Sequence, residues 1–144
     1  MPMIQIRFAA PASSPATGLE AGIAARAAAL AAQWLGKDPT VTAVLVERAE
    51  AHHWFVGGRS LAQEGLAASW LDIRVTEGTN TKDEKAAFVA ATFAAMAELL
   101  GPLHPESYVH VVEARADAYG YGGLTQERRY IAARPAPDSA RPRS

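Results

Sequence analysis

Apolar and polar residues alternate in two short stretches of the chain, and this pattern predicts two β-strands. Successive side chains of a strand point to opposite faces of a sheet, so an alternating stretch buries one face only. The stretches are residues 4–8 and 71–75, and the positions between their apolar residues hold Gln5, Arg7, Asp72 and Arg74. Each strand is therefore expected to carry a polar residue and then an arginine on its outer face.

An Ala-rich stretch with helical periodicity follows each predicted strand. Before each one, a threonine precedes a glutamate by three residues, as in a capping box that satisfies the free N–H groups of a helix start. The pairs are Thr17 with Glu20 and Thr81 with Glu84. The apolar stripes predicted to face the core are Leu19, Ile23, Leu30 and Trp34 in the first helix, and Phe88, Val89, Phe93, Met96, Leu99 and Leu100 in the second.

Each helix is predicted to end at a glycine, Gly36 or Gly101, and to be followed by a second strand. These return strands, expected at residues 41–47 and 108–113, are rich in β-branched residues. An aromatic residue then precedes a Gly-Gly pair by three positions, at Trp54 and at Tyr119. Both copies therefore predict a tight glycine turn after the return strand.

These landmarks occur twice in the same order, so the chain is an internal repeat with a period of about 65 residues. A strand–helix–strand unit implies a right-handed crossover and parallel pairing. We expect one α+β domain over residues 1–134, in which unit one (2–58) and unit two (69–131) form one mixed sheet with both helices on one face. Residues 135–144 are expected to be a disordered tail. The other face of the sheet would need a cover, which association of several chains would supply.

Composition excludes several classes of function. The 144 residues carry a net charge of −1 and no cysteine, so thiolate catalysis, disulfides and cysteine metal sites are excluded. The balanced charge, without a basic stripe, gives no reason to expect nucleic acid as a partner. The Ala-rich stretch of residues 22–35 is too short for a membrane span and is interrupted by Arg26 and Gln33. We expect a cytoplasmic protein that binds no membrane and no metal.

Three local motifs in this repeat resemble the 4-oxalocrotonate tautomerase family of the tautomerase superfamily. They are the N-terminal Pro2-Met3-Ile4-Gln5-Ile6, the Glu77-Gly78-Thr79 stretch before the second helix, and the aromatic-x-x-Gly-Gly turn that appears twice. The family's longer members contain two fused β-α-β units and assemble as trimers, and the chain resembles this fused kind over residues 2–131. The resemblance therefore implies a homotrimer.

The resemblance also implies a reaction. In this family the N-terminal proline, exposed by removal of the initiator methionine, is the catalytic base, and here that residue is Pro2. A general base must be neutral at working pH, and desolvation or nearby cations would lower the pKa of the prolyl nitrogen. The implied activity is keto–enol or double-bond isomerisation of a small enol or 2-oxo acid without a cofactor. The structural alternative is that Pro2 only begins a strand.

The arginines with which the family binds substrate carboxylates are not present at the matching positions. Those positions hold Thr79, Thr42 and Tyr108. A guanidinium grips a carboxylate with two parallel hydrogen bonds, so another arginine could take this role. The candidates are Arg7, Arg74 and Arg115. Arg74 is preferred because it lies on the strand face that is expected to need a cover. The alternative for each is an ordinary surface ion pair.

Four further residues are candidates for contacts with the substrate. The aromatic residue before the glycine turn lines the family's active site, and this position holds Trp54 in the first unit and Tyr119 in the second. Packing at a subunit interface is an equal alternative for both. Tyr108 and His110 would share one face of the second return strand and form a polar pair near a pocket. A structural histidine is the alternative for His110.

Two other functions are compatible with the same resemblance. Relatives use the same proline for hydration, dehalogenation or decarboxylation of short unsaturated or oxo acids, which requires an additional group to activate water. The missing arginines also allow a non-catalytic oligomeric module that binds a ligand.

Overall fold

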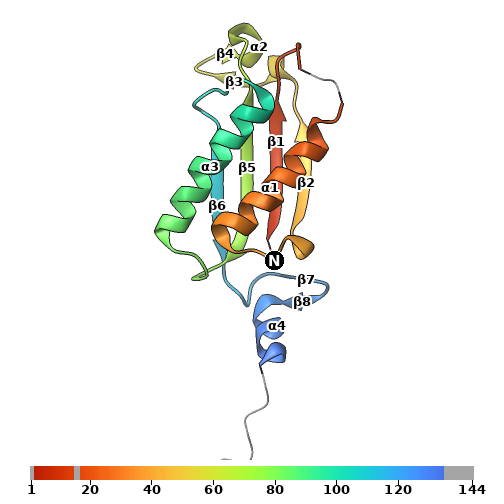
Figure 1. The fold of residues 1–144 in the computed structure, drawn as a ribbon, viewed down its shortest axis with the longest axis vertical. Helices are drawn as coiled ribbons and strands as arrows, with labels where there is room; N and C mark the ends of the chain where they lie inside the picture. The colour runs from red at the N-terminus through yellow and green to blue at the C-terminus, as the bar shows by residue number, and fades with distance from the viewer. Residues whose placement is uncertain (1, 15–16, 135–144) are drawn as a thin grey trace, which may run out of the picture.

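The computed structural model describes residues 2–14 and 17–134 of the chain. The first unit consists of β1 (Met3–Ala9), α1 (Leu19–Leu35), the 3-10 helix η1 (Pro39–Val41), β2 (Ala43–Arg48), the 3-10 helix η2 (Ala51–His53), β3 (Phe55–Val56), β4 (Arg59–Ser60) and α2 (Leu61–Glu64). The second unit consists of β5 (Ala68–Thr76), α3 (Lys82–Leu100), β6 (Tyr108–Ala114), β7 (Gly120–Tyr121), β8 (Leu124–Thr125) and α4 (Gln126–Ala133). Figure 1 shows the same succession of strand, helix, strand, hairpin and short helix in both units.

The four long strands form one mixed sheet in the order β2-β1-β5-β6. Each unit contributes a parallel pair, β1 with β2 and β5 with β6, as the crossover predicted. The two units meet in an antiparallel pair between β1 and β5, in which Met3 stands opposite Arg74 and Phe8 opposite Ser69. The helices α1 and α3 pack side by side on one face of this sheet (Figure 1), which confirms the predicted α+β fold.

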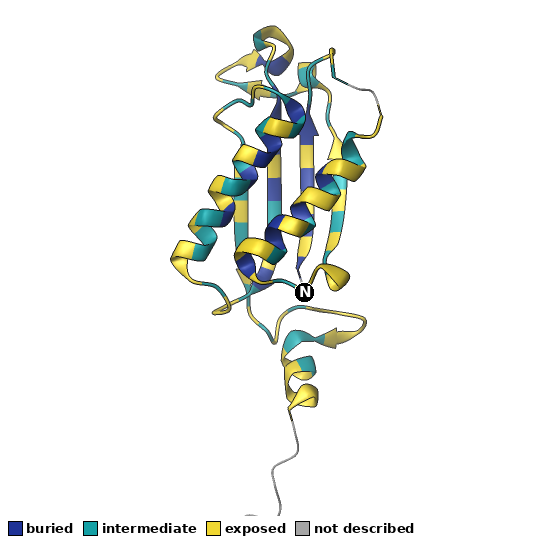
Figure 2. Cartoon of the chain, in the orientation of Figure 1, coloured by how far each residue is buried: buried dark blue, intermediate teal, exposed yellow. Residues whose placement is uncertain are grey.

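The core lies between the sheet and the two helices. The inward side chains of the predicted strands are buried together with residues of both helices, as the dark bands in Figure 2 show. The largest of them are Ile4, Ile6, Phe8, Leu71, Ile73, Ile23, Phe88 and Met96. Burial of one such side chain stabilises the fold by about 1.5–3 kcal/mol, so the alternating pattern alone accounts for much of the packing.

The two helix starts differ, although the sequence predicted a capping box at both. Thr81 accepts a hydrogen bond from the Glu84 N–H while the Glu84 carboxylate accepts one from the Thr81 N–H, so the second box is confirmed. The prediction for Thr17 was wrong, because Gly18, with a left-handed φ of 93°, is the N-cap of α1. Its partner Glu20 instead forms an ion pair with Arg48 at 3.2 Å.

Three further predictions need correction. Val41 belongs to η1 and not to the return strand, because the Asp38 side chain caps a turn that begins at Pro39. Trp34 and Val89 are exposed, because the apolar stripes of the helices are narrower than their sequences suggested. The short helices α2 and α4 were not predicted. The expected tail, residues 135–144, lies outside the described residues.

The face of the sheet opposite the helices has no cover within the described chain. It exposes the large apolar side chains of Met3, Leu45, Trp70 and Tyr108, which alternate with polar residues along the strands. An apolar patch of this kind typically marks an interaction surface. None of the helices in the described segments has the length and apolar character needed to cross a membrane.

Candidate functional site

Pro2 lies immediately before β1, at one end of the sheet. Its carbonyl oxygen accepts a hydrogen bond from the Ala43 N–H at 3.2 Å, which aligns it with the start of β2, and its side chain is buried. Because β1 and β5 are antiparallel with Met3 opposite Arg74, the C-terminal end of β5 lies beside Pro2. Figure 1 marks this end of the sheet with the letter N.

Two other predicted site residues lie at this same end. Arg74 is exposed beside Met3 and has no hydrogen bond or ion pair with any described residue. The Tyr119 hydroxyl hydrogen-bonds the Thr76 hydroxyl at 2.8 Å, which joins the turn after β6 to the last residue of β5. The structure therefore brings Pro2, Arg74 and Tyr119 to one end of the molecule.

Lys37 is a residue of this end that the sequence analysis missed. It follows α1 in the segment that leads to η1, and its Nζ donates a hydrogen bond to Thr79 Oγ1 at 3.1 Å. Burial lowers the pKa of Lys37, against the smaller opposing effect of Glu84. No carboxylate in the described chain forms an ion pair with it. The sequence feature that could have indicated Lys37 is its position between Gly36, which ends the helix, and Pro39. At this point the chain passes the start of β1.

The remaining predicted residues, Trp54, Tyr108 and His110, lie toward the opposite end of the sheet. The reason is topological: β6 is parallel to β5 and therefore antiparallel to β1, so Tyr108 is level with Trp70 and not with Pro2. A hollow of about 930 Å³ opens there. It is lined by Arg7, Ala49, His53, Trp54, Phe55, Val56, Gly57, Trp70, Glu106, Tyr108, Val109 and His110.

Tyr108 and His110 share the uncovered face of β6, as predicted. The Tyr108 hydroxyl donates to a Glu106 carboxylate oxygen at 2.6 Å, and this bond raises the pKa of Tyr108. His110 Nδ1 lies 3.8 Å from Asp72 Oδ1, which also accepts a hydrogen bond from the Trp70 indole at 3.0 Å. The hollow is thus mainly apolar, with four aromatic side chains and several polar groups, which is the usual character of a small-molecule site.

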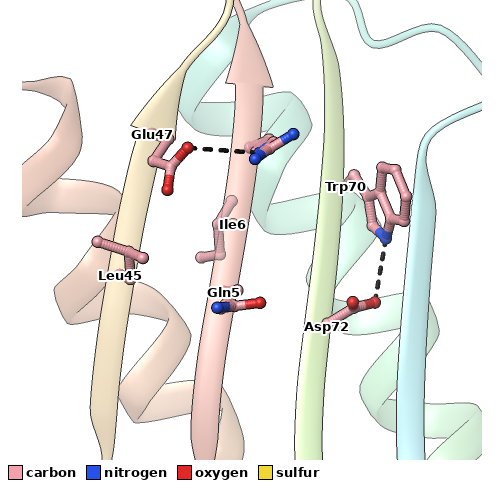
Figure 3. A pocket seen from close by; sticks show the side chains of 7 residues that line it. Gln5, Ile6, Leu45, Glu47, Trp70 and Asp72 are labelled. Carbon is pink, nitrogen blue, oxygen red and sulfur yellow. Dashed lines mark hydrogen bonds and ion pairs between the residues drawn. The ribbon is translucent and has the colours of Figure 1, made fainter.

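A second, smaller hollow of about 180 Å³ lies on the same face between β2, β1 and β5 (Figure 3). The Arg7–Glu47 ion pair, 3.4 Å long, lies on one side of this hollow. Figure 3 shows the Trp70–Asp72 hydrogen bond on the other side. Arg7 therefore already has an acidic partner. Arg115 has one too, because its guanidinium binds both oxygens of Asp117.

In one chain the candidate residues thus form two separate groups. Pro2, Lys37, Arg74 and Tyr119 could hold and deprotonate a small anion at one end, while Trp54, Tyr108 and His110 surround an aromatic hollow toward the other. No cluster of three or more His, Asp or Glu side chains suited to a metal ion occurs within residues 2–14 and 17–134. A single chain does not bring the two groups together.

The sequence matches no protein-family model and no curated protein. Solved structures are similar in fold. A fused 4-OT wild-type symmetric trimer has a TM-score of 0.73 and 16% identity over 92% of this chain and 99% of that chain. A native fused 4-OT has a TM-score of 0.71 and 22% identity over 86% and 97%. The macrophage migration inhibitory factor-like protein from Entamoeba histolytica has a TM-score of 0.68 and 16% identity over 86% and 97%. The chain therefore has the fused two-unit fold that the resemblance implied.

Proposed function

We propose that this protein is a tautomerase that moves a proton on a small enol or 2-oxo acid, with the Pro2 nitrogen as general base. The observation that carries the proposal is the position of Pro2 at the start of β1, at the same end of the sheet as Lys37 and Arg74. Neither cation forms an ion pair with a described residue. A base and two uncommitted cations at one end of the sheet suit an acid substrate.

The physical chemistry of the prolyl nitrogen supports this role. Removal of Met1 would leave Pro2 with a free secondary amine at the start of the chain. An ordinary α-amino group has a pKa of about 7.7–8.0, so a modest lowering is enough to make such an amine neutral at working pH. Burial around Pro2 disfavours a protonated amine, so it favours the neutral form that a base requires. The neutral nitrogen would accept a proton from the enol oxygen or the α-carbon. The resulting ammonium would return a proton to the conjugated carbon, so no net charge or atom is gained.

The two cations replace the arginines that are missing from the matching positions. Arg74 can bind a carboxylate with two parallel hydrogen bonds, and the partly desolvated ammonium of Lys37 can act as a point charge. The Lys37 ammonium contacts Thr79, the residue at one of those positions. A charge-assisted hydrogen bond is about twice as strong as a neutral one, so either cation would contribute measurably to substrate affinity.

We also propose that the chain forms a homotrimer and that the site is completed by a second copy. Fused 4-OT structures similar to this chain include symmetric and asymmetric trimers. The uncovered sheet face, with Leu45 and Trp70 exposed, provides the surface for association. In the trimer, the aromatic hollow around Trp54, Tyr108 and His110 of one chain would lie against the Pro2 end of another, where Tyr119 supplies the wall from its own chain.

Ketonisation of phenylenolpyruvate and of 2-hydroxymuconate, followed by ultraviolet absorbance, tests the proposal. The protein is expressed without a tag, and its intact mass must first show that Met1 has been removed. Pro2→Ala should then lower kcat/KM by about 10²–10⁴-fold, the range of general acid–base catalysis. Pro11→Ala, at a proline in the loop after β1, is the matched control and should retain activity. Unchanged turnover in Pro2→Ala would exclude Pro2 as the base. Inactivity of the wild type with a free Pro2 would favour a non-catalytic ligand-binding module.

A further inference from the structure

The loop between α3 and β6 is fixed to the start of β5 by backbone and side-chain hydrogen bonds. The Ala67 N–H donates to the Pro102 carbonyl at 3.0 Å, and the His104 N–H donates back to the Ala67 carbonyl at 2.8 Å. The Ser69 N–H donates to Ser107 Oγ at 3.2 Å. The backbone of His104 is therefore held at the end of the sheet where β5 and β6 begin and where α2 lies (Figure 1).

The imidazole of His104 lies between a backbone N–H and a carboxylate. Its Nδ1 accepts a hydrogen bond from the Glu106 N–H at 2.9 Å. A neutral imidazole has one acceptor nitrogen and one N–H, so its ring hydrogen then lies on Nε2. Nε2 faces Glu64 of α2, whose Oε2 is 3.6 Å away. The two neighbours of the ring thus agree on a single neutral tautomer.

Glu106 extends this contact to the aromatic hollow. Its Oε2 accepts a hydrogen bond from the Tyr108 hydroxyl at 2.6 Å, and both residues line the hollow. His104 holds the backbone of Glu106, and Glu106 holds the hydroxyl of Tyr108. The described residues that line the hollow do not include His104, so it can act on the hollow only through Glu106.

A proton on Nδ1 of His104 would break the first of these contacts. An imidazolium carries an N–H on both nitrogens, so it cannot accept the Glu106 N–H. The side chain is 15% exposed, so water can deliver the proton. The charged groups around the ring in the described chain are Glu64 from α2, Arg59 from β4, which pairs with Glu64 at 3.3 Å, and Glu106 from the same loop. Both carboxylates would attract an imidazolium.

We infer that His104 is a positioning residue for the aromatic hollow: its neutral imidazole holds Glu106, which orients the Tyr108 hydroxyl, and its protonation releases both. This inference rests on the proposed function, in which Tyr108 of one chain lies against the Pro2 end of another. Protonation at Nδ1 leaves Nε2–H directed at Glu64, so the change is confined to Glu106 and Tyr108. The site would thereby lose part of its wall in mild acid, for a reason separate from the protonation of Pro2.

Two replacements of His104 reproduce its two states. In His104→Asn, Oδ1 can accept the Glu106 N–H, as an asparagine does from an N–H two residues on in an Asx turn, and it does not titrate. His104→Ala has no acceptor at any pH. The value of kcat/KM for phenylenolpyruvate is measured for all three proteins from about pH 5 to 8, the range in which a histidine changes charge. Pro2 titrates in each of them, so the ratio to His104→Asn isolates the effect of His104.

The wild type should equal His104→Asn at the alkaline end of this range and fall below it by about two- to tenfold at the acid end, as expected for the loss of one neutral hydrogen bond. His104→Ala should lie below His104→Asn by about the same factor throughout. His52→Gln is the matched control, because His52 is an exposed histidine that pairs with Glu50 outside the hollow. It should follow the wild type at every pH. An active wild type whose ratio to His104→Asn does not change with pH would overturn the inference.

NMR separates this inference from the proposed function, since it requires no turnover. The nitrogen-15 signals of the His104 ring and the amide signal of Glu106 are followed during an acid titration. In the wild type, the ring should carry its hydrogen on Nε2 at neutral pH, and the Glu106 amide should shift as the ring takes up a proton. In His104→Asn this shift should be absent. These results would support the inference even if the wild type proves inactive, whereas a Glu106 amide that does not follow the His104 ring would overturn it.

Discussion

Lys37 and Thr79 connect the two units at the Pro2 end of the sheet. Lys37 Nζ donates to Thr79 Oγ1 at 3.1 Å, and Thr79 Oγ1 in turn donates to the Thr76 carbonyl at 2.6 Å. The path therefore leads from the segment after α1 to the last residue of β5, which lies near Pro2. As a result, the cation that contacts Thr79 comes from the first unit and not from the turn before α3.

Lys37→Met is expected to weaken the binding of acid substrates. Loss of a charge-assisted hydrogen bond of about 1.5–3 kcal/mol should raise KM for phenylenolpyruvate by about tenfold or more, with a smaller effect on kcat. Lys82→Met is the control, because Lys82 is an exposed lysine at the start of α3. Equal KM values in the two variants would show that Lys37 does not bind substrate.

The lowered pKa of Lys37 predicts how its replacement changes stability with pH. Below the lowered pKa, Lys37 is protonated in both the folded and the unfolded chain, so the folded chain bears the full cost of desolvating the ammonium. As pH rises through the folded-state value toward the ordinary 10.5, the folded chain releases this proton first, and that cost is relieved. The wild type should therefore gain stability relative to Lys37→Met across this alkaline window. Urea unfolding of both proteins at neutral and alkaline pH measures the difference, and parallel curves would contradict it.

Trp70→Glu is expected to prevent association through the uncovered sheet face. Trp70 is 48% exposed on that face, and a carboxylate there would have to be buried in any interface. Sedimentation should show the wild type at about three times 15.3 kDa and Trp70→Glu at the mass of one chain. Val89→Glu, at an exposed apolar residue on the helical side, should stay assembled. A monomeric wild type would refute the proposed trimer.

A site shared between chains should allow two inactive variants to complement each other. Pro2→Ala lacks the base and Tyr108→Ala lacks a wall of the aromatic hollow, so each is expected to be inactive or nearly so alone. After unfolding and joint refolding in equal amounts, roughly one quarter of the sites would combine an intact Pro2 with an intact Tyr108 from another chain. Recovery of activity after mixed refolding, but not after mixing folded proteins, supports the shared site. No recovery at all would place Tyr108 outside it.

Local patterns in the sequence predicted most of the fold. The alternation of residues 4–8 and 71–75 and the capping box at Thr81 are local signals, and the structure confirms them. The short helices α2 and α4 were missed because four and eight residues are too few to show a helical period.

The arrangement of the candidate site could not be predicted in the same way. It depends on how the units meet: the antiparallel pairing of β1 with β5 separates Pro2 from Tyr108 and brings Lys37 to Thr79. Nothing within either unit specifies that pairing, because each unit has the same local pattern. A sequence repeat therefore identifies the parts of the site but not which parts meet in one chain.

The two helix starts provide a test of capping within one molecule. Thr81→Ala removes the hydroxyl that accepts from the Glu84 N–H and should reduce the free energy of unfolding by about 1 kcal/mol. Thr17→Ala is the matched control and should have little effect, because Gly18 is the N-cap of α1 and no side chain caps it. Urea unfolding at neutral pH measures both, and equal losses would contradict the observed caps.

The same box predicts a loss of stability in acid. Hydrogen bonds from Thr81 lower the pKa of Glu84, so its carboxylate stabilises the helix above the unfolded-state pKa. This stabilisation is lost as pH falls through the lowered folded-state value, where the carboxylate becomes protonated and accepts these bonds less well. Glu84→Gln keeps the shape of the side chain but cannot titrate, so its stability should fall less steeply in acid than that of the wild type. Identical acid unfolding profiles would show that the Glu84 carboxylate does not stabilise the start of α3.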